Sequence, residues 1–281
     1  MILSISVVIL TYNEEKNIEE CLKSLNGIAE NIFIVDSGST DDTINIVKKY
    51  TDKIYTNTFE NYSQQRNWAF DNLPINTEWI MNLDADHRVT EELKNELIEI
   101  FSASIDNDIK GFLSSRKTIF MNRWIKHGGH YPVYHAFMFR KGFGYCEDKI
   151  YDQHFVVNGK VKILNGDIID IITDSLSTFT LRHNLWSDLE AIEAFKNNTQ
   201  EGTGTISPKL SGHPIEKRRL LKKFYLKFPL FVRPIVYFLY RYFIRFGFLD
   251  GKEGLIFHFL QGFWFRFLID AKLYEHYKKN I

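Results

Sequence analysis

The chain has 281 residues, of which 44% are hydrophobic, 15% aromatic and 25% charged. This composition excludes a disordered chain, and the length allows one large domain or a domain with an appendage. Two cysteines are too few for a disulfide framework or a zinc cluster, which favours a reducing compartment. The first six residues lack the basic region and cleavage site of a signal peptide, so we expect them to lead directly into a core strand.

The first hundred residues alternate predicted strands and helices. Apolar runs typical of buried parallel strands cover residues 5–10, 32–35 and 79–83, and a shorter strand is expected near residue 54. Repeated strand–helix units predict an α/β fold, with a mostly parallel sheet and helices on both faces. Ligands of such sheets bind beyond the carboxyl ends of the strands.

Polar residues that favour helix starts follow these strands. Asn13 is expected to cap a first helix, Asp41 and Asp42 to open a second, and Thr90 to cap the one after the fourth strand. A further helix is predicted through Arg66. The predicted strand ends therefore carry side chains that can either cap helices or bind a ligand.

After residue 110 the pattern changes to shorter strands and aromatic-rich loops. The loop that holds Trp124, His127, His130 and Tyr131 offers rings on which a ligand could stack, although core packing explains most aromatic residues in such a chain. A helix is predicted over residues 187–195. The glycine, serine and proline residues of 202–214 then predict a linker or mobile loop.

A formal net charge of zero hides an asymmetry along the chain. Residues 208–281 hold 15 of the 35 basic residues, 5 of the 35 acidic residues and 12 of the 24 phenylalanines. The remainder of the chain is correspondingly acidic. We therefore predict an acidic body joined to a basic, aromatic tail.

The tail has the pattern of an amphipathic helix interrupted by prolines. Lys227, Arg233, Arg241 and Arg245 fall within about 120° of one another at 100° per residue, and most other positions are apolar. The second apolar segment, residues 255–265, is shorter than the roughly 20 residues that a spanning helix needs. The tail is therefore predicted to lie in a membrane interface. The alternative is a helical subdomain packed on the body or on a dimer partner.

The strongest chemical signal is the pair Asp84 and Asp86, directly after the apolar strand of residues 79–83. Two carboxylates at a strand end can hold Mg²⁺ or Mn²⁺ against a diphosphate, because hard cations prefer oxygen ligands. A metal there would neutralise charge on a nucleoside-diphosphate leaving group.

With this pair, the segments 6–14 and 34–41 resemble the family 2 glycosyltransferases. These are inverting enzymes of the GT-A fold that use nucleotide-diphosphate sugars. The whole chain also resembles, less specifically, the bacterial branch that includes lipopolysaccharide-core β-1,4-glucosyltransferases. The resemblance implies a GT-A domain over residues 1–207, in which 1–100 bind the nucleotide sugar and 101–207 the acceptor, followed by the tail of residues 208–281.

The resemblance also implies roles for single residues. Thr11, Tyr12 and Glu14 would lie beside the base and ribose, and Asp36 near the uracil or ribose. Helix capping and turn formation are the alternatives for these residues. Arg66 would lie near the nucleotide, with an exposed helical arginine as the alternative. The metal would be held chiefly by Asp86, with Asp84 as a second ligand. Asp84 would also lie beside the nucleotide sugar. The chain departs from many relatives at Ser37, where they carry a second acid.

An inverting transfer needs a general base for the acceptor hydroxyl. Relatives commonly carry a glutamate where this chain has Gln153, so the base is expected at Asp152 first, Asp148 second and Glu147 third. Surface-loop carboxylates are the alternative. Asp170 aligns with a histidine that completes the metal site in relatives. The triplet Arg182, His183 and Asn184 is a further candidate for contact with diphosphate or acceptor, although a lone histidine is more often structural.

The prediction is transfer of a sugar from a UDP-sugar to a membrane-linked saccharide, with Mg²⁺ or Mn²⁺ as cofactor. The tail would hold the enzyme at an anionic membrane, on the inner face of the bacterial plasma membrane. Nucleic acid is not expected as a partner, because bulky apolar residues are interleaved with the basic ones. Two alternatives remain: transfer to polyprenyl phosphate, which needs no base, and a non-catalytic scaffold that binds a membrane or a saccharide.

Overall fold

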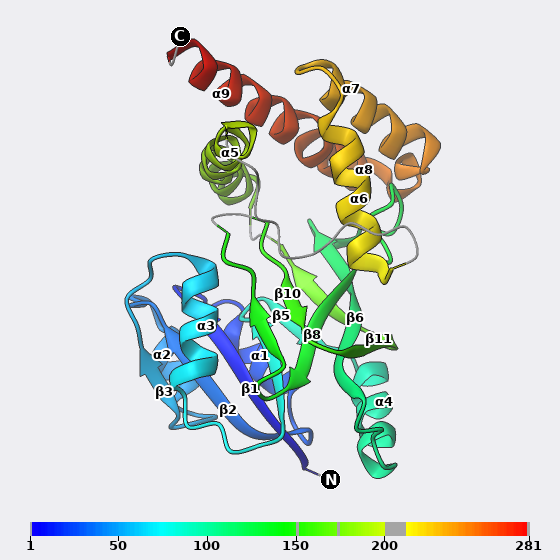
Figure 1. Cartoon of the computed structure of the whole chain (residues 1–281). Coiled ribbons are helices and arrows are strands. Elements are labelled where there is room, and N and C mark those ends of the chain that lie inside the picture. Colours follow the sequence, from blue (N-terminus) through cyan, green and yellow to red (C-terminus); the bar gives the residue numbers. More distant parts are fainter. Residues whose placement is uncertain (1, 150–151, 173–174, 200–211, 280–281) are drawn as a thin grey trace. The chain divides into compact units, whose positions relative to one another are not determined.

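The computed structural model describes residues 2–149, 152–172, 175–199 and 212–279, which form two compact units (Figure 1). Unit 1 comprises Met1–Arg116, Tyr134–Asp148 and Gln153–Asp170, and unit 2 comprises Lys117–Val133, Lys149–Asp152 and Ile171–Ile281. The two units do not divide at the predicted tail boundary of residue 208. Instead, unit 2 adds two shorter segments and a long helix to the tail.

The first half of unit 1 contains the predicted alternation of strands and helices. Its strands are β1 (Leu3–Thr11), β2 (Ala29–Asp36), β3 (Ile54–Thr56) and β4 (Trp79–Asp84), and its helices are α1 (Ile18–Ser24), α2 (Thr43–Val47) and α3 (Tyr62–Asn72). The strands pair in parallel in the order β3-β2-β1-β4. Thr11 lies opposite Asp36, and Leu10 lies opposite Asp84. The carboxyl ends of the three strands therefore meet at one edge.

The second half of unit 1 extends this sheet beyond β4. Its elements are β5 (His87–Val89), α4 (Glu91–Ser102), β6 (Ile109–Phe120), β8 (Tyr134–Arg140), β9 (Gly144–Cys146), β10 (Phe155–Val157) and β11 (Lys160–Ile171). The complete order is β3-β2-β1-β4-β8-β6-β11-β5, and β8 is antiparallel to both β4 and β6. The predicted α/β fold is confirmed, with the parallel pairs β2–β3, β1–β2 and β1–β4 in its first half.

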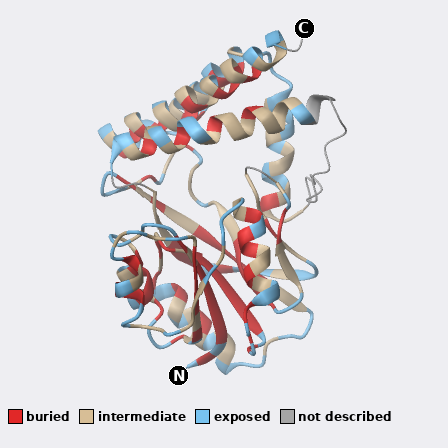
Figure 2. Cartoon of the chain, turned by 90° about the vertical axis from the view of Figure 1, so that its left-hand side faces the viewer, coloured by how far each residue is buried: buried red, intermediate tan, exposed pale blue. Residues whose placement is uncertain are grey.

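Helices cover both faces of this sheet, as predicted. Alternate residues of β1, including Val7 and Ile9, pack with Leu22 of α1 and Leu93 of α4 in one core cluster. On the opposite face, Phe70 of α3 packs edge-on against a ring of β8. The buried strands between half-exposed helices are visible in Figure 2.

Two predicted helix starts have different outcomes. Thr90 caps α4, because its side chain accepts the backbone N–H of Leu93. Asn13 is not a cap, since α1 begins five residues later at Ile18. The backbone of Asn13 has a φ of 54°, and its side chain accepts the N–H of Thr40 at 2.8 Å. The left-handed backbone cannot begin a helix, and the side chain instead joins the loops that follow β1 and β2.

Unit 2 is largely helical in the part of the chain that the structure describes. Its elements are β7 (Arg123–Trp124), α5 (Leu176–Thr199), α6 (Pro214–Leu226), α7 (Val232–Leu239), the π-helix η1 (Tyr240–Ile244), the 3₁₀-helix η2 (Gly247–Asp250), α8 (Gly251–Phe257), the π-helix η3 (His258–Trp264) and α9 (Phe265–Lys279). The helix predicted over 187–195 is the middle of the longer α5. Most of the predicted linker lies outside the described residues. Within those residues, no helix combines the length and apolar character needed to cross a bilayer.

The prediction that the basic residues of the tail share one exposed helical face is wrong. Lys227 and Arg245 are exposed, but Arg233 and Arg241 are buried. Arg233 pairs with Asp270 of α9, and Arg241 donates from Nε to the carbonyl oxygen of Gly128 at 2.8 Å. These internal partners orient α7 and η1 so that Arg233 and Arg241 face the protein.

Candidate active site

The loop after β2 is organised around Asp36. The hydroxyl of Thr11 donates to Oδ1 of Asp36 at 3.1 Å, while the backbone N–H groups of Gly38 and Ser39 donate to Oδ2, each at 2.9 Å. Gly38 has a φ of 93°, a conformation that glycine adopts without strain. Thr11 and Asp36 are both buried, so they shape this turn at the carboxyl edge of the sheet.

The loop after β1 presents the other predicted nucleotide residues. The side chain of Tyr12 is 58% exposed, which leaves its ring open to a planar ligand. The backbone N–H of Glu14 donates to Thr43 at 2.8 Å, and its carboxylate accepts from Asn17 at 2.9 Å. The structure thus brings Thr11, Tyr12 and Glu14 into one loop at this edge.

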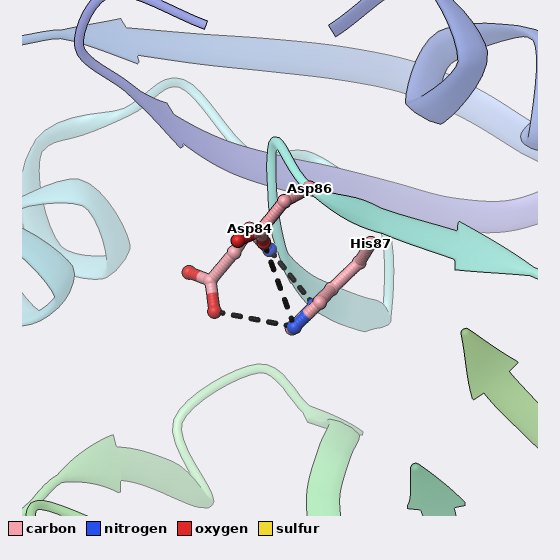
Figure 3. Close-up of side chains that lie close together, drawn as sticks. All are labelled: Asp84, Asp86 and His87. Atoms are coloured by element: carbon pink, nitrogen blue, oxygen red, sulfur yellow. Dashed lines mark hydrogen bonds and ion pairs between the residues drawn. The ribbon is translucent and has the colours of Figure 1, made fainter. Parts of the chain in front are cut away.

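Three side chains meet at the end of β4, namely Asp84, Asp86 and His87 (Figure 3). Each offers a ligand atom, and these atoms lie within 4.8 Å of one another. The backbone N–H of Asp84 donates to Nδ1 of His87 at 3.1 Å. A neutral ring with this bond carries its proton on Nε2, which faces Oδ2 of Asp84 at 3.4 Å. The ring of His87 is therefore held by the backbone of Asp84, with Nε2 beside the carboxylates of Asp84 and Asp86.

Arg66 lies beneath this cluster and is fully buried. Its guanidinium donates to the carbonyl oxygens of Val8 at 3.2 Å and Leu83 at 2.6 Å, and it also pairs with Oδ1 of Asp84. The phenol of Tyr62 donates to the same oxygen at 2.8 Å. The exposed-arginine alternative is excluded. In this arrangement Arg66 fixes the position of Asp84.

The two aspartates have opposite electrostatic surroundings. Burial opposes ionisation of Asp84, but the charges of Arg66 and Arg116 outweigh it and hold the pKa of Asp84 below its ordinary value. For Asp86, burial and the nearby carboxylates of Asp170, Asp84 and Glu14 raise the pKa well above its ordinary value. Asp86 thus sits among several carboxylates, and the nearby charge of Arg116 offsets their effect on its pKa only in part.

Asp170 belongs to the same acidic group. It lies opposite His87 in the pairing of β11 with β5, and Nη1 of Arg116 lies 3.8 Å from its Oδ2. Burial raises the pKa of Asp170 to about 6, and Asp84 adds to the rise. The structure therefore brings this sequence-predicted residue to Asp84 and Asp86.

The donor set fits a hard divalent cation. Carboxylate oxygens are the ligands that Mg²⁺ and Mn²⁺ prefer, and a cation would relieve the repulsion around Asp86. Asp86 and Asp84 would hold it, with Asp170 close by. His87 was not among the predicted site residues, although its place directly after Asp86 puts it in the same turn.

The three candidates for the general base lie in different surroundings. Asp148 is exposed, whereas Glu147 is fully buried and accepts the backbone N–H of His154 at 3.1 Å. Asp152 belongs to unit 2, where its carboxylate accepts from Lys222 at 2.8 Å and Arg219 at 3.4 Å. Two cationic partners stabilise the carboxylate of Asp152 and weaken it as a proton acceptor.

Several polar candidates of unit 2 have structural partners. His183 is buried, with Nδ1 at 2.8 Å from the carbonyl oxygen of Phe179, and burial lowers its pKa to about 4. It is a core histidine of α5. His127 pairs through Nδ1 with the buried Asp250 at 2.6 Å, and His130 lies 3.0 Å from the hydroxyl of Thr118.

The aromatic-rich loop of residues 124–131, which could serve as a platform for a sugar, contains one pair of edge-on rings. The rings of Trp124 and Tyr131 meet edge-on with centroids 5.0 Å apart, and the ammonium groups of Lys117 and Lys126 lie over the indole. Their role in binding a sugar stays a prediction.

The chain has relatives that match nearly its whole length and others that match a part of it. An uncharacterized glycosyltransferase of Rickettsia typhi is 26% identical over 283 residues, covering 96% of this chain and 87% of the relative. The lipopolysaccharide core biosynthesis glycosyltransferase LpsC of Rhizobium meliloti is 34% identical over 120 residues, covering 41% of this chain and 43% of LpsC. Among solved structures, S. aureus TarS residues 1–349 with UDP has a TM-score of 0.44 at 17% identity, covering 99% of this chain and 92% of that one.

The family assignment rests on the match of the chain to a family model. The sequence model of glycosyl transferase family 2 matches residues 6–155, which is more than half of the chain and includes every strand-end residue described above except Asp170. The chain belongs to glycosyl transferase family 2.

Proposed function

We propose that this glycosyltransferase transfers a sugar from a UDP-sugar to a lipid-linked saccharide, with inversion and with a divalent cation. The observation that carries the proposal is the acidic turn after β4, where Asp86 faces Asp84, Asp170 and Glu14. Such a site is suited to a cation–diphosphate complex. Bound Mg²⁺ or Mn²⁺ would supply positive charge to the departing diphosphate.

The donor nucleotide would lie along the carboxyl edge of the parallel strands. Tyr12 would cover the base with its exposed ring, and Glu14 would lie beside the ribose. Thr11 and Asp36 would act through the turn that they hold together. Arg66 would contribute by keeping Asp84 oriented.

We assign the general base to Asp148 in preference to Asp152 and Glu147. An exposed carboxylate can meet an acceptor hydroxyl, whereas Asp152 is engaged by two cations and Glu147 is buried. Asp148 would take the hydroxyl proton while the oxygen attacks the anomeric carbon. The bond to the diphosphate breaks on the opposite face, which inverts the anomeric centre.

The class of acceptor is supported by the relatives and by unit 2. The match to LpsC, although partial, suggests lipopolysaccharide core or a related envelope polysaccharide, such as capsule or exopolysaccharide. Many large apolar side chains between Leu221 and Tyr274 are exposed, which suits an enzyme that meets lipid-linked substrates at an anionic membrane. We therefore place the protein on the inner face of the bacterial plasma membrane.

The test is a panel of UDP-sugars assayed for UDP release with Mn²⁺, with Mg²⁺ and with EDTA. Asp86→Asn should abolish metal-dependent release, while Asp71→Asn on the exposed side of α3 should not. Product NMR should show an inverted anomeric configuration. Full metal-dependent activity in Asp86→Asn would refute the metal role. UDP binding without metal dependence or turnover would favour a scaffold.

A second candidate is transfer to polyprenyl phosphate. The ion pairs of Asp152 and the presence of Gln153 at the position expected for the base favour an acceptor that is already ionised. This reading predicts that Asp148→Asn and Asp152→Asn keep full activity with polyprenyl phosphate. Loss of activity in Asp148→Asn supports the saccharide hydroxyl instead.

A further inference from the structure

One face of α7 and η1 carries an unbroken row of exposed apolar side chains. Each is between 44% and 66% exposed, and their spacing of three and four residues puts them on one side of the helix. We call this row the outer stripe: Val232, Ile235, Val236, Leu239, Tyr240, Phe243 and Ile244. In a helix that packs on a protein core, such a row faces inward.

Buried polar contacts fix this reversed orientation. Arg233 donates from Nε to Asp270 at 2.8 Å, and Asp270 also accepts the backbone N–H of Phe231 at 2.9 Å. About two turns further on, Arg241 donates to Gly128 and, from Nη1, to Gln261 at 2.9 Å. A rotation that buried the outer stripe would break both sets of contacts and bring two charged groups to the surface.

We propose that the outer stripe inserts into the boundary between headgroups and acyl chains of an anionic bilayer, with the helix lying in the membrane plane. The 13 residues from Val232 to Ile244 extend about 20 Å, which is shorter than the roughly 30 Å hydrocarbon core. Tyr240 and Phe243 are side chains of the kind that favour membrane interfaces. Length and composition thus fit a helix that lies in the interface.

The exposed charge of unit 2 agrees with anionic lipid. Eight basic residues are exposed in the described part of unit 2 after residue 211: Lys217, Arg218, Lys223, Lys227, Arg245, Lys252, Lys278 and Lys279. Two of the acidic residues, Asp250 and Asp270, are buried, and Glu275 is exposed. A second copy of the chain would bring like charges together, whereas anionic headgroups complement them.

The inward arginines change the expected mode of binding. Arg233 and Arg241 have protein partners, so they do not reach the headgroups. The larger part of the binding energy would come from apolar insertion, assisted by the exposed lysines. Salt screens charges but leaves apolar burial intact. Binding should therefore persist at high ionic strength.

The inference rests on the proposed function only for its lipid-linked acceptor, and the experiment separates the two. Full-length protein is floated with vesicles of phosphatidylcholine and phosphatidylglycerol at 0.1 M and 1 M NaCl. The test variant is Leu239→Gln with Phe243→Gln. The matched control is Leu181→Gln with Leu185→Gln on α5, where the side chains are 63% and 56% exposed and also lie one turn apart.

We expect the test variant to lower vesicle binding by about tenfold or more, and the control variant by less than about twofold. Wild-type binding should fall by less than about fivefold between the two salt concentrations. Unbound wild-type protein, or equal losses in both variants, would overturn the proposal. A third result would also overturn it: the wild-type protein sediments as a dimer without vesicles, whereas the test variant is a monomer that still binds vesicles as well as the wild type.

Metal-dependent UDP release, measured without vesicles, reports on the proposed function separately. Unchanged release with lost vesicle binding in the test variant supports the role of the outer stripe. Vesicle binding through the outer stripe by a protein that turns over no UDP-sugar would refute the proposed function and leave this inference standing.

Discussion

Replacing Arg66 by methionine should destabilise unit 1 and disturb the metal site together. Arg66 is fully buried and pairs with Asp84, whose side chain is 28% exposed. Removing one partner of a buried ion pair costs about 3–5 kcal/mol, because the other charge loses its compensation. The remaining exposure of Asp84 puts the loss from the pair near the lower end, at about 3 kcal/mol.

The backbone contacts of Arg66 add to this loss. The carbonyl oxygens of Val8 and Leu83 would lose their guanidinium donor, which brings the expected total to about 4 kcal/mol. For a domain of this size, that corresponds to a fall in Tm of about 8–16 °C. Arg66→Lys keeps the charge but offers a single ammonium, so it should recover about half of the loss.

The assay combines thermal unfolding, followed by circular dichroism, with titration of Mn²⁺ followed by electron paramagnetic resonance. Arg140→Met is the matched control, since Arg140 is also buried in unit 1 but pairs with Glu78, which is 61% exposed. Its loss should stay near 1 kcal/mol, because an exposed partner is resolvated. Arg66→Met should in addition weaken Mn²⁺ binding, whereas the control should not. Equal Tm changes in the two variants, or unchanged Mn²⁺ affinity in Arg66→Met, would refute the reasoning.

Three further predictions concern stability. Arg233→Met should lower the free energy of unfolding, measured by denaturation in urea, by about 3–5 kcal/mol, because it leaves Asp270 buried without its partner. Adding Asp270→Leu should restore most of this stability. A further loss in the double variant would contradict the prediction. Burial lowers the pKa of His183 to about 4, so its contribution to stability is complete above about pH 6.5 and is lost as the pH falls toward 4. His183→Phe should therefore narrow the difference between urea midpoints at pH 7 and pH 5, and an unchanged difference would count against a neutral buried ring. Gly166→Ala should lower the free energy of unfolding by about 1–3 kcal/mol, because a Cβ there would lie 2.3 Å from a backbone atom of α4. In the control Gly262→Ala the added Cβ has no atom within 4 Å, so this variant should be nearly neutral in the same denaturation assay.

The sequence by itself determined the succession of strands and helices in the first hundred residues and the polar residues at the strand ends. Apolar runs over residues 5–10, 32–35 and 79–83 predicted three strands of a mostly parallel sheet, and all three are present. Polar residues directly after such strands must gather at one edge, because parallel pairing aligns the carboxyl ends. Asp36 and Asp84 could therefore be assigned to one site before any contact was known.

Only the tertiary structure decided which partners these side chains have. The sequence placed Arg66 on a helix but could not show that it pairs with Asp84, 18 residues away, or that the ring of His87 lies beside the same carboxylate. Nor could it separate the roles of Asp148 and Asp152, because the cations beside Asp152 come from α6, about 70 residues further along.

The tail shows the same limit most clearly. Helical periodicity identifies the residues that share a face, but it does not tell which face points toward the protein. That choice depends on partners distant in sequence, here Asp270 for Arg233 and the carbonyl oxygen of Gly128 for Arg241. A buried guanidinium needs such partners, since an unpaired charge inside a protein is costly. The pairing of the arginines therefore turns the apolar face of α7 and η1 outward.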